Sequence, residues 1–143
     1  MNQVAILYPV FAQVLLTLSV YLLLLATRYR AMRDAGRLRG GADIALGRYP
    51  WPADAEKAAH NQRNQFELPV LFYAVVAFAL IVGAADATLV GLGWAFVASR
   101  IVHSAIHIGP NKVRWRGPAF ALGFLFVTAM WVKLFLHVAW RVT

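Results

Sequence analysis

The 143-residue sequence contains no cysteine, and this absence removes several kinds of chemistry at once. Without cysteine there are no disulfides, no protein thiolate nucleophile and no cysteine-ligated metal. Any sulfur chemistry carried out by this chain must therefore use a thiol that a substrate or cofactor brings.

Charged residues are also scarce, because Asp, Glu, Lys and Arg make up only 14% of the chain, whereas hydrophobic residues make up 61%. Soluble domains average about 25% charged and about 45–50% apolar residues. Polar and apolar residues do not alternate with a period of two, so the apolar excess predicts long helices rather than strands. A helix that spans a membrane needs roughly 20 mostly apolar residues.

Long apolar stretches account for most of the chain and predict four membrane-spanning helices, at about residues 4–27, 54–84, 87–108 and 118–140. The second stretch begins in a polar segment, and Pro69 is expected to bend its helix just after Glu67. Pro118 is placed well to begin the fourth helix, because proline suits a first helical turn. The first stretch has no basic segment before it and is too long for a signal peptide, so it is expected to remain as a helix.

Apart from the segment from Arg28 to Glu56, the connections between these stretches are short, and no room remains for a separate soluble domain. The sequence shows neither internal repeats nor low-complexity segments. Residues 1–143 are therefore expected to form one all-α membrane domain, an up-down-up-down bundle of four transmembrane helices.

Positive charge is concentrated in two of the connections, which explains most of the net charge of +8. One group follows the first helix and another follows the third: Arg28, Arg30, Arg33, Arg37, Arg39 and Arg48, then Lys112, Arg114 and Arg116. The turn between the second and third helices carries Asp86 and no Lys or Arg. The positive-inside rule therefore predicts cytoplasmic basic loops and both termini outside the cytoplasm. These charges attract anionic lipid headgroups, and since no basic surface interleaved with aromatic residues occurs elsewhere, we expect no nucleic-acid partner.

Two rows of ionisable or polar side chains interrupt the apolar helices. Each row falls on one helical face: His60, Arg63, Asn64 and Glu67 in the second helix, and Arg100, His103 and His107 in the third. Charges at membrane depth are expensive, and those that are kept usually face a bundle interior and mark a polar site. We expect both rows to meet at the cytoplasmic end of the bundle, near Arg28 and Arg116.

This set offers one carboxylate among several guanidinium and imidazole groups, which suits a small, multiply anionic molecule that also carries an amine. Arginine grips carboxylates through two hydrogen bonds, and Glu67 could hold an ammonium group. Structural alternatives stay open, because Glu67 could form an ion pair with Arg63 or Arg100. Likewise, His60 could face the lipid headgroups.

Metal binding is the next possibility, because His103 and His107 have the i, i+4 spacing of a zinc pair. A third ligand would have to come from His60 or Glu67. Several arginines are expected in the same layer, and their positive charges would repel a cation. We therefore expect no metal.

The run HNQRNQFELP, at residues 60–69, resembles the second-helix signature of the MAPEG family, the membrane-associated proteins of eicosanoid and glutathione metabolism. That signature reads roughly R-A-H-x-N-x-x-E followed by a proline, and Asn64 and Glu67 occupy its Asn and Glu positions. Where the family keeps functional residues in its third helix and the loop that follows, this chain has Arg100, His103 and Arg116. The resemblance covers almost the whole chain, including the number of helices.

The resemblance implies a homotrimer of four-helix bundles in a membrane of the bacterial inner-membrane type, with glutathione bound as cosubstrate between neighbouring subunits. Residues expected by family position to contact glutathione are Glu67 at its amine, and Arg28, Arg63, Asn64, Arg100 and His103 around the rest of the molecule. Arg116 would lie beside the sulfur and stabilise the thiolate, which is the form that attacks electrophiles.

The sequence departs from the eicosanoid-type members of the family near the sulfur. Their hydroxyl side chains correspond here to Gly117 and Phe120, and the tyrosine of their third helix corresponds to His107. His107 could replace one donor or act as a base near neutral pH.

The leading expectation is therefore a glutathione-dependent membrane transferase or peroxidase that acts on lipophilic electrophiles, with Arg116 and His107 as catalytic residues. One alternative is a non-catalytic membrane protein of the same fold, which binds a lipid or small anion or serves as a partner subunit. Another is a small anion transporter or channel subunit. Against this last reading, the outer halves of the second and third helices lack polar residues to continue a pore.

Overall fold

The computed structural model of the chain describes residues 3–34, 44 and 46–142. Its elements are, in chain order, the 3-10 turn η1 (Gln3–Ile6) and the helices α1 (Leu7–Asp34), α3 (Ala53–Asn64), α4 (Leu68–Ile81), α5 (Ala87–Ile108) and α6 (Val113–Val142). No strand occurs within these described ranges. Arg37 and Arg39, which the sequence places in the first basic loop, lie outside the described residues.

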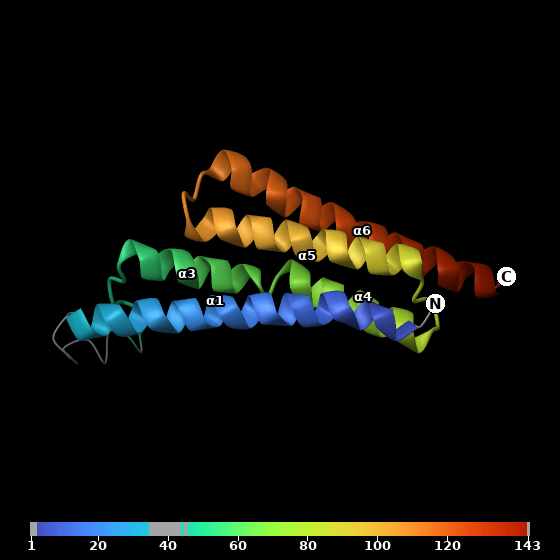
Figure 1. Ribbon diagram of the computed structural model, residues 1–143, viewed down its shortest axis with the longest axis horizontal. Helices are drawn as coiled ribbons and strands as arrows, with labels where there is room; N and C mark the ends of the chain where they lie inside the picture. Colours follow the sequence, from blue (N-terminus) through green and yellow to red (C-terminus); the bar gives the residue numbers. More distant parts are fainter. Residues whose placement is uncertain (1–2, 35–43, 45, 143) are drawn as a thin grey trace.

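Four segments of the described chain are long and apolar enough to cross a membrane: Gln3–Arg33, Ala53–Ile81, Ala87–Ile108 and Val113–Arg141. They run alternately up and down, so that both chain ends lie at one end of the bundle (Figure 1). The C-terminal end of α1, the N-terminal end of α3 and the α5–α6 connection lie toward the opposite end (Figure 1). This is the four-helix transmembrane bundle that the sequence predicts.

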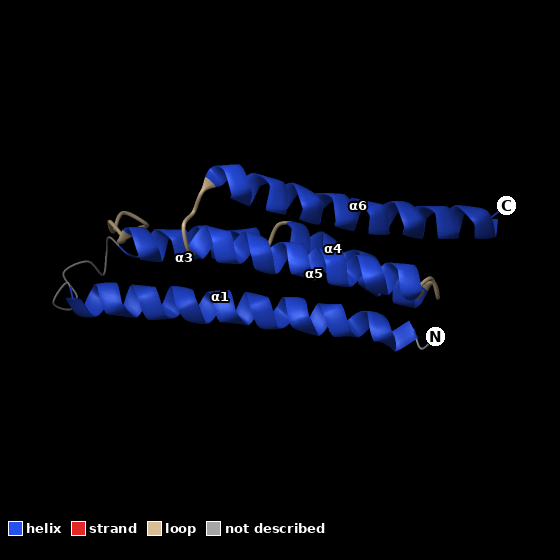
Figure 2. Ribbon diagram, turned by 45° about the horizontal axis from the view of Figure 1, so that its top comes forward, coloured by secondary structure: helices blue, strands red, loops and turns tan. Residues whose placement is uncertain are grey.

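The helices form an elongated bundle in which α1 and α6 lie on opposite sides, with α3, α4 and α5 between them (Figure 2). The most extensive packing joins α5 to α6, and α1 packs mainly on α3. Gly93 of α5 allows α1 to come close, because a Cβ atom there would lie 3.1 Å from Cγ of Pro9. The site described below is formed by the two central helices α3 and α5 together with α6.

Apolar side chains occupy both the inside and the outside of this bundle. Inside, Phe72 of α4 stacks on Phe96 of α5 with ring centroids 4.6 Å apart, and neither side chain is exposed. Outside, large side chains such as Leu22, Ile81 and Phe135 are mostly exposed. Water-soluble proteins rarely expose apolar surface on this scale, whereas lipid hydrocarbon covers it at no cost.

The second transmembrane segment is broken rather than bent. Helix α3 ends at Asn64 and α4 begins at Leu68, so the interruption falls before Pro69 and not after it. Pro69 instead occupies the first turn of α4, where its missing N–H group has no helical partner to lose. The break turns the chain at the residues that the sequence singles out, Asn64 and Glu67.

The fourth helix begins at Val113 rather than at Pro118, which lies inside α6. Asn111 has a positive φ of 48°, a conformation that Asn tolerates, and it reverses the chain just before the helix. Helical hydrogen bonding then starts with Trp115 and Arg116, whose N–H groups both donate to the carbonyl oxygen of Lys112. Arg116 is therefore held in the first turn of a helix and not in a loop.

At the other end of the bundle, Asp86 joins α5 to α6. It caps α5 by accepting a hydrogen bond from the N–H of Leu89 at 2.9 Å, and Lys133 Nζ of α6 lies 2.8 Å from its Oδ2. Burial raises the pKa of Asp86, but the hydrogen bonds from Lys133 and the backbone outweigh this effect and hold its pKa below the usual value. This contact fixes the end of the bundle farthest from the site.

Candidate functional site

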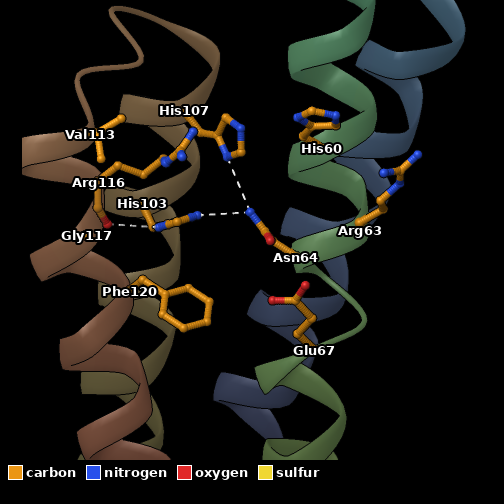
Figure 3. A pocket seen from close by; sticks show the side chains of 10 residues that line it. All are labelled: His60, Arg63, Asn64, Glu67, His103, His107, Val113, Arg116, Gly117 and Phe120. Atoms are coloured by element: carbon orange, nitrogen blue, oxygen red, sulfur yellow. Dashed lines mark hydrogen bonds between the residues drawn. The ribbon is translucent and has the colours of Figure 1, made fainter.

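An open cavity of about 480 Å³ lies between α3, α5 and α6, on the side of the bundle where α5 connects to α6. Three groups of side chains line it: His60, Arg63, Asn64 and Glu67 from α3 and the break, His103 and His107 from α5, and Val113, Arg116, Gly117 and Phe120 from α6. Figure 3 shows Asn64 and Glu67 facing the residues of α5 and α6 across the cavity, while Arg63 extends the other way. The two polar rows of the sequence therefore meet at one place.

Asn64 is the contact between the two rows. Its Nδ2 atom lies 3.3 Å from Nε2 of His103 and 3.3 Å from Nδ1 of His107. The other ring nitrogen of His103, Nδ1, lies 3.3 Å from the carbonyl oxygen of Arg116 (Figure 3). Through these contacts α3, α5 and the first turn of α6 are joined at the cavity wall.

Arg116 is itself held in place by a residue of the α5–α6 connection. Its Nη1 atom donates to Oδ1 of Asn111 at 2.7 Å. A guanidinium group has five N–H donors, so this bond leaves others for a ligand. The arrangement presents a positive charge at the α6 wall of the cavity.

Glu67 supplies the only carboxylate of the cavity lining, and it points into the cavity (Figure 3). Among the described residues it forms no ion pair with either Arg63 or Arg100, so the structural pairs that the sequence leaves open do not form within this chain. Arg63 is exposed and extends away from the two imidazoles (Figure 3). The carboxylate is consequently available to a bound cation.

Arg100 lies beneath the cavity and not on its surface. The side chain is completely buried, its Nη2 donates to the carbonyl oxygen of Asn64 at 3.1 Å, and its guanidinium lies 5.4 Å from the ring centre of Phe120. It thereby satisfies a carbonyl at the end of α3, where helices leave such groups without helical partners. In this chain Arg100 supports the helix break, which differs from the ligand contact expected from the sequence.

Arg28 is likewise not part of the cavity lining. Its guanidinium lies 4.9 Å from the ring centre of Trp51, just before α3, and its buried Nε atom has no hydrogen-bond partner. Six of the eight residues that the sequence singles out line the cavity, and the two that do not are Arg28 and Arg100.

A buried polar network beside the cavity was missed by the sequence reasoning. Gln13 Nε2 donates to Gln65 Oε1 at 3.0 Å, Gln65 Nε2 donates to Ser104 Oγ at 3.1 Å, and Ser104 Oγ donates to Asn61 Oδ1 at 3.2 Å. All four side chains are buried. Two features of the sequence could have indicated this network. Asn61 and Gln65 have the i, i+4 spacing of one helical face, and Gln13 is a polar amide in a membrane span that carries no charge.

Metal coordination receives no support from the geometry. Within the described part of the chain, no three His, Asp or Glu side chains are grouped so that they could hold a metal ion. His103 and His107 both direct a ring nitrogen at Asn64, and their ring centres are 5.6 Å apart.

Comparison with protein-family models decides the family. The model of the MAPEG family matches residues 6–136, which include all of α1, α3, α4 and α5, most of α6 and every residue of the cavity lining. The chain belongs to the MAPEG family. This family includes glutathione transferases and peroxidases as well as proteins that are not enzymes. No curated protein and no solved structure matches the chain.

Proposed function

We propose that this MAPEG protein binds glutathione in the cavity and uses it to modify a lipophilic electrophile or to reduce a lipid hydroperoxide. The observation that carries the proposal is the charge pattern of the lining, with a single carboxylate, Glu67, among guanidinium and imidazole groups. Glutathione carries two carboxylates, one ammonium and one thiol. Its charges therefore complement those of the cavity.

The size of the cavity supports the same ligand class. Small-molecule pockets commonly have volumes of about 300–1,000 Å³, and this one has about 480 Å³. Glu67 would hold the ammonium, and Arg63 would bind a carboxylate through two hydrogen bonds. Val113 and Phe120 give the α6 wall an apolar part, next to which a lipophilic substrate would meet the thiol.

The proposed chemistry depends on ionisation of the bound thiol. A thiolate is the attacking species, and a guanidinium beside it favours the charged form. Arg116 would supply that charge from the first turn of α6. In conjugation, the thiol proton is released, the thiolate sulfur forms the new bond to the electrophilic carbon, and the leaving group departs with its electron pair. In hydroperoxide reduction, the thiolate sulfur takes the outer oxygen and the alcohol leaves. A second glutathione then displaces that oxygen as water and forms glutathione disulfide.

The orientation of the site in the membrane can be inferred from the positions of the basic residues, and its oligomeric setting from the family. The basic residues Arg30, Arg48 and Arg114 lie toward the same end of the bundle as the cavity, so we infer that this end faces the cytoplasm. We further infer a homotrimer, as the family resemblance implies. In such an assembly Arg28, which lies outside the cavity of its own chain, would be available to glutathione bound next to a neighbouring subunit.

The absence of hydroxyl side chains from the described cavity wall near Arg116 favours a second candidate function. Gly117 and Phe120 stand there, and neither offers a hydroxyl donor to a thiol. A non-catalytic protein that binds a small anion or lipid headgroup in the same cavity would need Arg116 and Arg63 but no activated sulfur. The two candidates therefore differ in whether bound glutathione is ionised.

Ultraviolet difference absorbance of glutathione titrated into detergent-purified protein separates them. We expect a thiolate band near neutral pH in the wild type and its loss in Arg116→Ala. Arg114→Ala is the matched control, because Arg114 is two residues away but is exposed and stacks on Trp115, with 5.0 Å between its guanidinium and the ring centre. Binding without the band would favour the non-catalytic candidate, and absence of binding would contradict glutathione as the ligand.

A further inference from the structure

Asn64 contacts two imidazole rings with one atom. Its Nδ2 lies within hydrogen-bond distance of His103 Nε2 and of His107 Nδ1, at 3.3 Å in each case. A carboxamide nitrogen carries two hydrogens and accepts no hydrogen bond, so it donates to both rings. Both of the contacted ring nitrogens must then act as acceptors.

A neutral imidazole that accepts at one nitrogen carries its hydrogen on the other. For His103 the hydrogen therefore lies on Nδ1, where it can be donated to the carbonyl oxygen of Arg116 at 3.3 Å. The two assignments agree, because the carbonyl also requires a donor. For His107 the hydrogen lies on Nε2, which faces the side of the cavity where His60 stands (Figure 3).

We infer that Asn64 is a positioning residue that holds His103 and His107 in two opposite neutral tautomers, so that His107 presents an Nε2–H donor to the bound thiolate. The last part rests on the proposed function. In this arrangement the imidazole supplies the hydrogen bond that the side chains of Gly117 and Phe120 cannot.

The surroundings of the two rings support this assignment. Both imidazoles are largely buried, with 2% and 3% of their surface exposed, so few water molecules compete with the amide for the contacted ring nitrogens. Their planes are inclined by 84°, and one amide group between them reaches both. The guanidinium of Arg100 donates to the backbone of the same Asn64, so an extra positive charge on the rings would be unfavourable there.

Nuclear magnetic resonance of protein with ¹⁵N-labelled histidine side chains, in detergent and without ligand, tests the tautomers directly. We expect a directly bonded hydrogen on Nδ1 of His103 and on Nε2 of His107. His103 is the diagnostic ring, because free histidine favours the Nε2–H form. The signals of each ring are identified by their disappearance in His103→Gln and His107→Gln.

Asn64→Asp exchanges the donor for an acceptor and should move the hydrogens. We expect hydrogen on His103 Nε2 and on His107 Nδ1 in this variant. Gln62→Glu is the matched control, because it adds the same charge to α3 at a side chain that bonds to Tyr21 instead, and it should leave both rings as in the wild type. Hydrogen on Nε2 of His103 in the wild type, or rings unchanged in Asn64→Asp, would overturn the inference.

The donor role is tested by adding glutathione to the labelled wild type. We expect the Nε2 signal of His107 to shift while that of His137, on the far part of α6, stays in place. If His107 does not respond although glutathione binds, its role as the donor is wrong. Because the tautomers are measured without ligand, failure of glutathione binding contradicts the proposed function and leaves the positioning role of Asn64 standing.

Discussion

Glu67 stands at the point where the chain has left α3 and has not yet entered α4. It is the N-cap residue of α4, but its side chain accepts no capping hydrogen bond from that helix. The carboxylate also forms no direct ion pair among the described residues, although the buried guanidinium of Arg100 is near enough to interact with its charge. This position fits the proposed role of Glu67, which is to hold the ammonium group of glutathione.

Glu67→Gln is expected to weaken glutathione binding by roughly 10-fold to 100-fold, because a hydrogen bond to a charged group contributes about 1.5–3 kcal/mol. Isothermal titration calorimetry in detergent measures the dissociation constants. A glutathione analogue without the amino group is the control, and it should bind wild type and Glu67→Gln equally well. Equal losses for glutathione and the analogue would contradict the assignment of Glu67 to the ammonium.

Individual site residues could be predicted where helical spacing alone decides their position. The helical spacing put His60 and Asn64 on one wall of the cavity, because both lie within α3 and the period of a helix is fixed. Glu67 reaches the same cavity from beyond the end of α3, so the helical period alone does not explain its position. The burial of Arg100 could not be predicted, since it depends on a backbone carbonyl that only the helix break leaves available. Arg116 was expected in a loop, because the fourth helix was predicted to begin at Pro118. The positive φ of Asn111, which precedes the earlier start of α6 at Val113, gave no clear signal in the sequence.

At the scale of the element, the interruption between α3 and α4 is the feature on which the site depends. An unbroken helix would carry Asn64 and Glu67 on a straight face, with no widening of the wall between them. Broken helices at membrane depth are tolerated where protein groups satisfy the freed backbone. Here Arg100 supplies such a group by donating to the carbonyl oxygen of Asn64, and the side chain of Gln65, inside the break, is held by hydrogen bonds to Gln13 and Ser104.

Gln65→Leu, which keeps a similar volume, is expected to destabilise the protein by about 1–2 kcal/mol. It removes two hydrogen bonds and leaves the polar groups of Gln13 and Ser104 without this partner. Unfolding in mixed micelles with increasing sodium dodecyl sulfate measures the change in the free energy of unfolding.

The matched control for that measurement is Gln62→Leu. Gln62 lies in the last turn of α3, three residues before Gln65, and its side chain bonds only to the Tyr21 hydroxyl in an exposed position, so its loss should change the free energy by less than about 0.5 kcal/mol. Equal effects of the two substitutions would show that the buried network does not stabilise the break.

At the scale of the whole molecule, the architecture could be predicted because it depends on the length and polarity of whole segments. Each of the four apolar stretches corresponds to one segment long and apolar enough to cross a membrane. The predicted bounds of the third stretch, residues 87–108, agree with those of α5. The other boundaries could not be placed as well, because helix α1 continues through a polar stretch to Asp34 and α6 begins before its proline. Local composition marks where lipid contact ends, while hydrogen bonding decides where a helix ends.

The orientation inferred from the basic loops predicts which ends of the helices an impermeant reagent reaches. Thr88→Cys places a thiol at the end that carries both termini, and Pro110→Cys places one in the α5–α6 connection. In intact cells we expect a membrane-impermeant maleimide to label Thr88→Cys, and to label Pro110→Cys only after permeabilisation. The cysteine-free wild type is the blank, and the reverse pattern would place the cavity on the outer side.

The hydrogen bond from Arg100 to Asn64 also has a consequence for biogenesis. The second span is synthesised before the third, so Asn64 enters the bilayer without its guanidinium donor. Arg100 in turn is costly to insert until that carbonyl is available. Neither span can form this hydrogen bond by itself, and the two are therefore expected to become stable in the membrane as a pair, after α5 has left the ribosome.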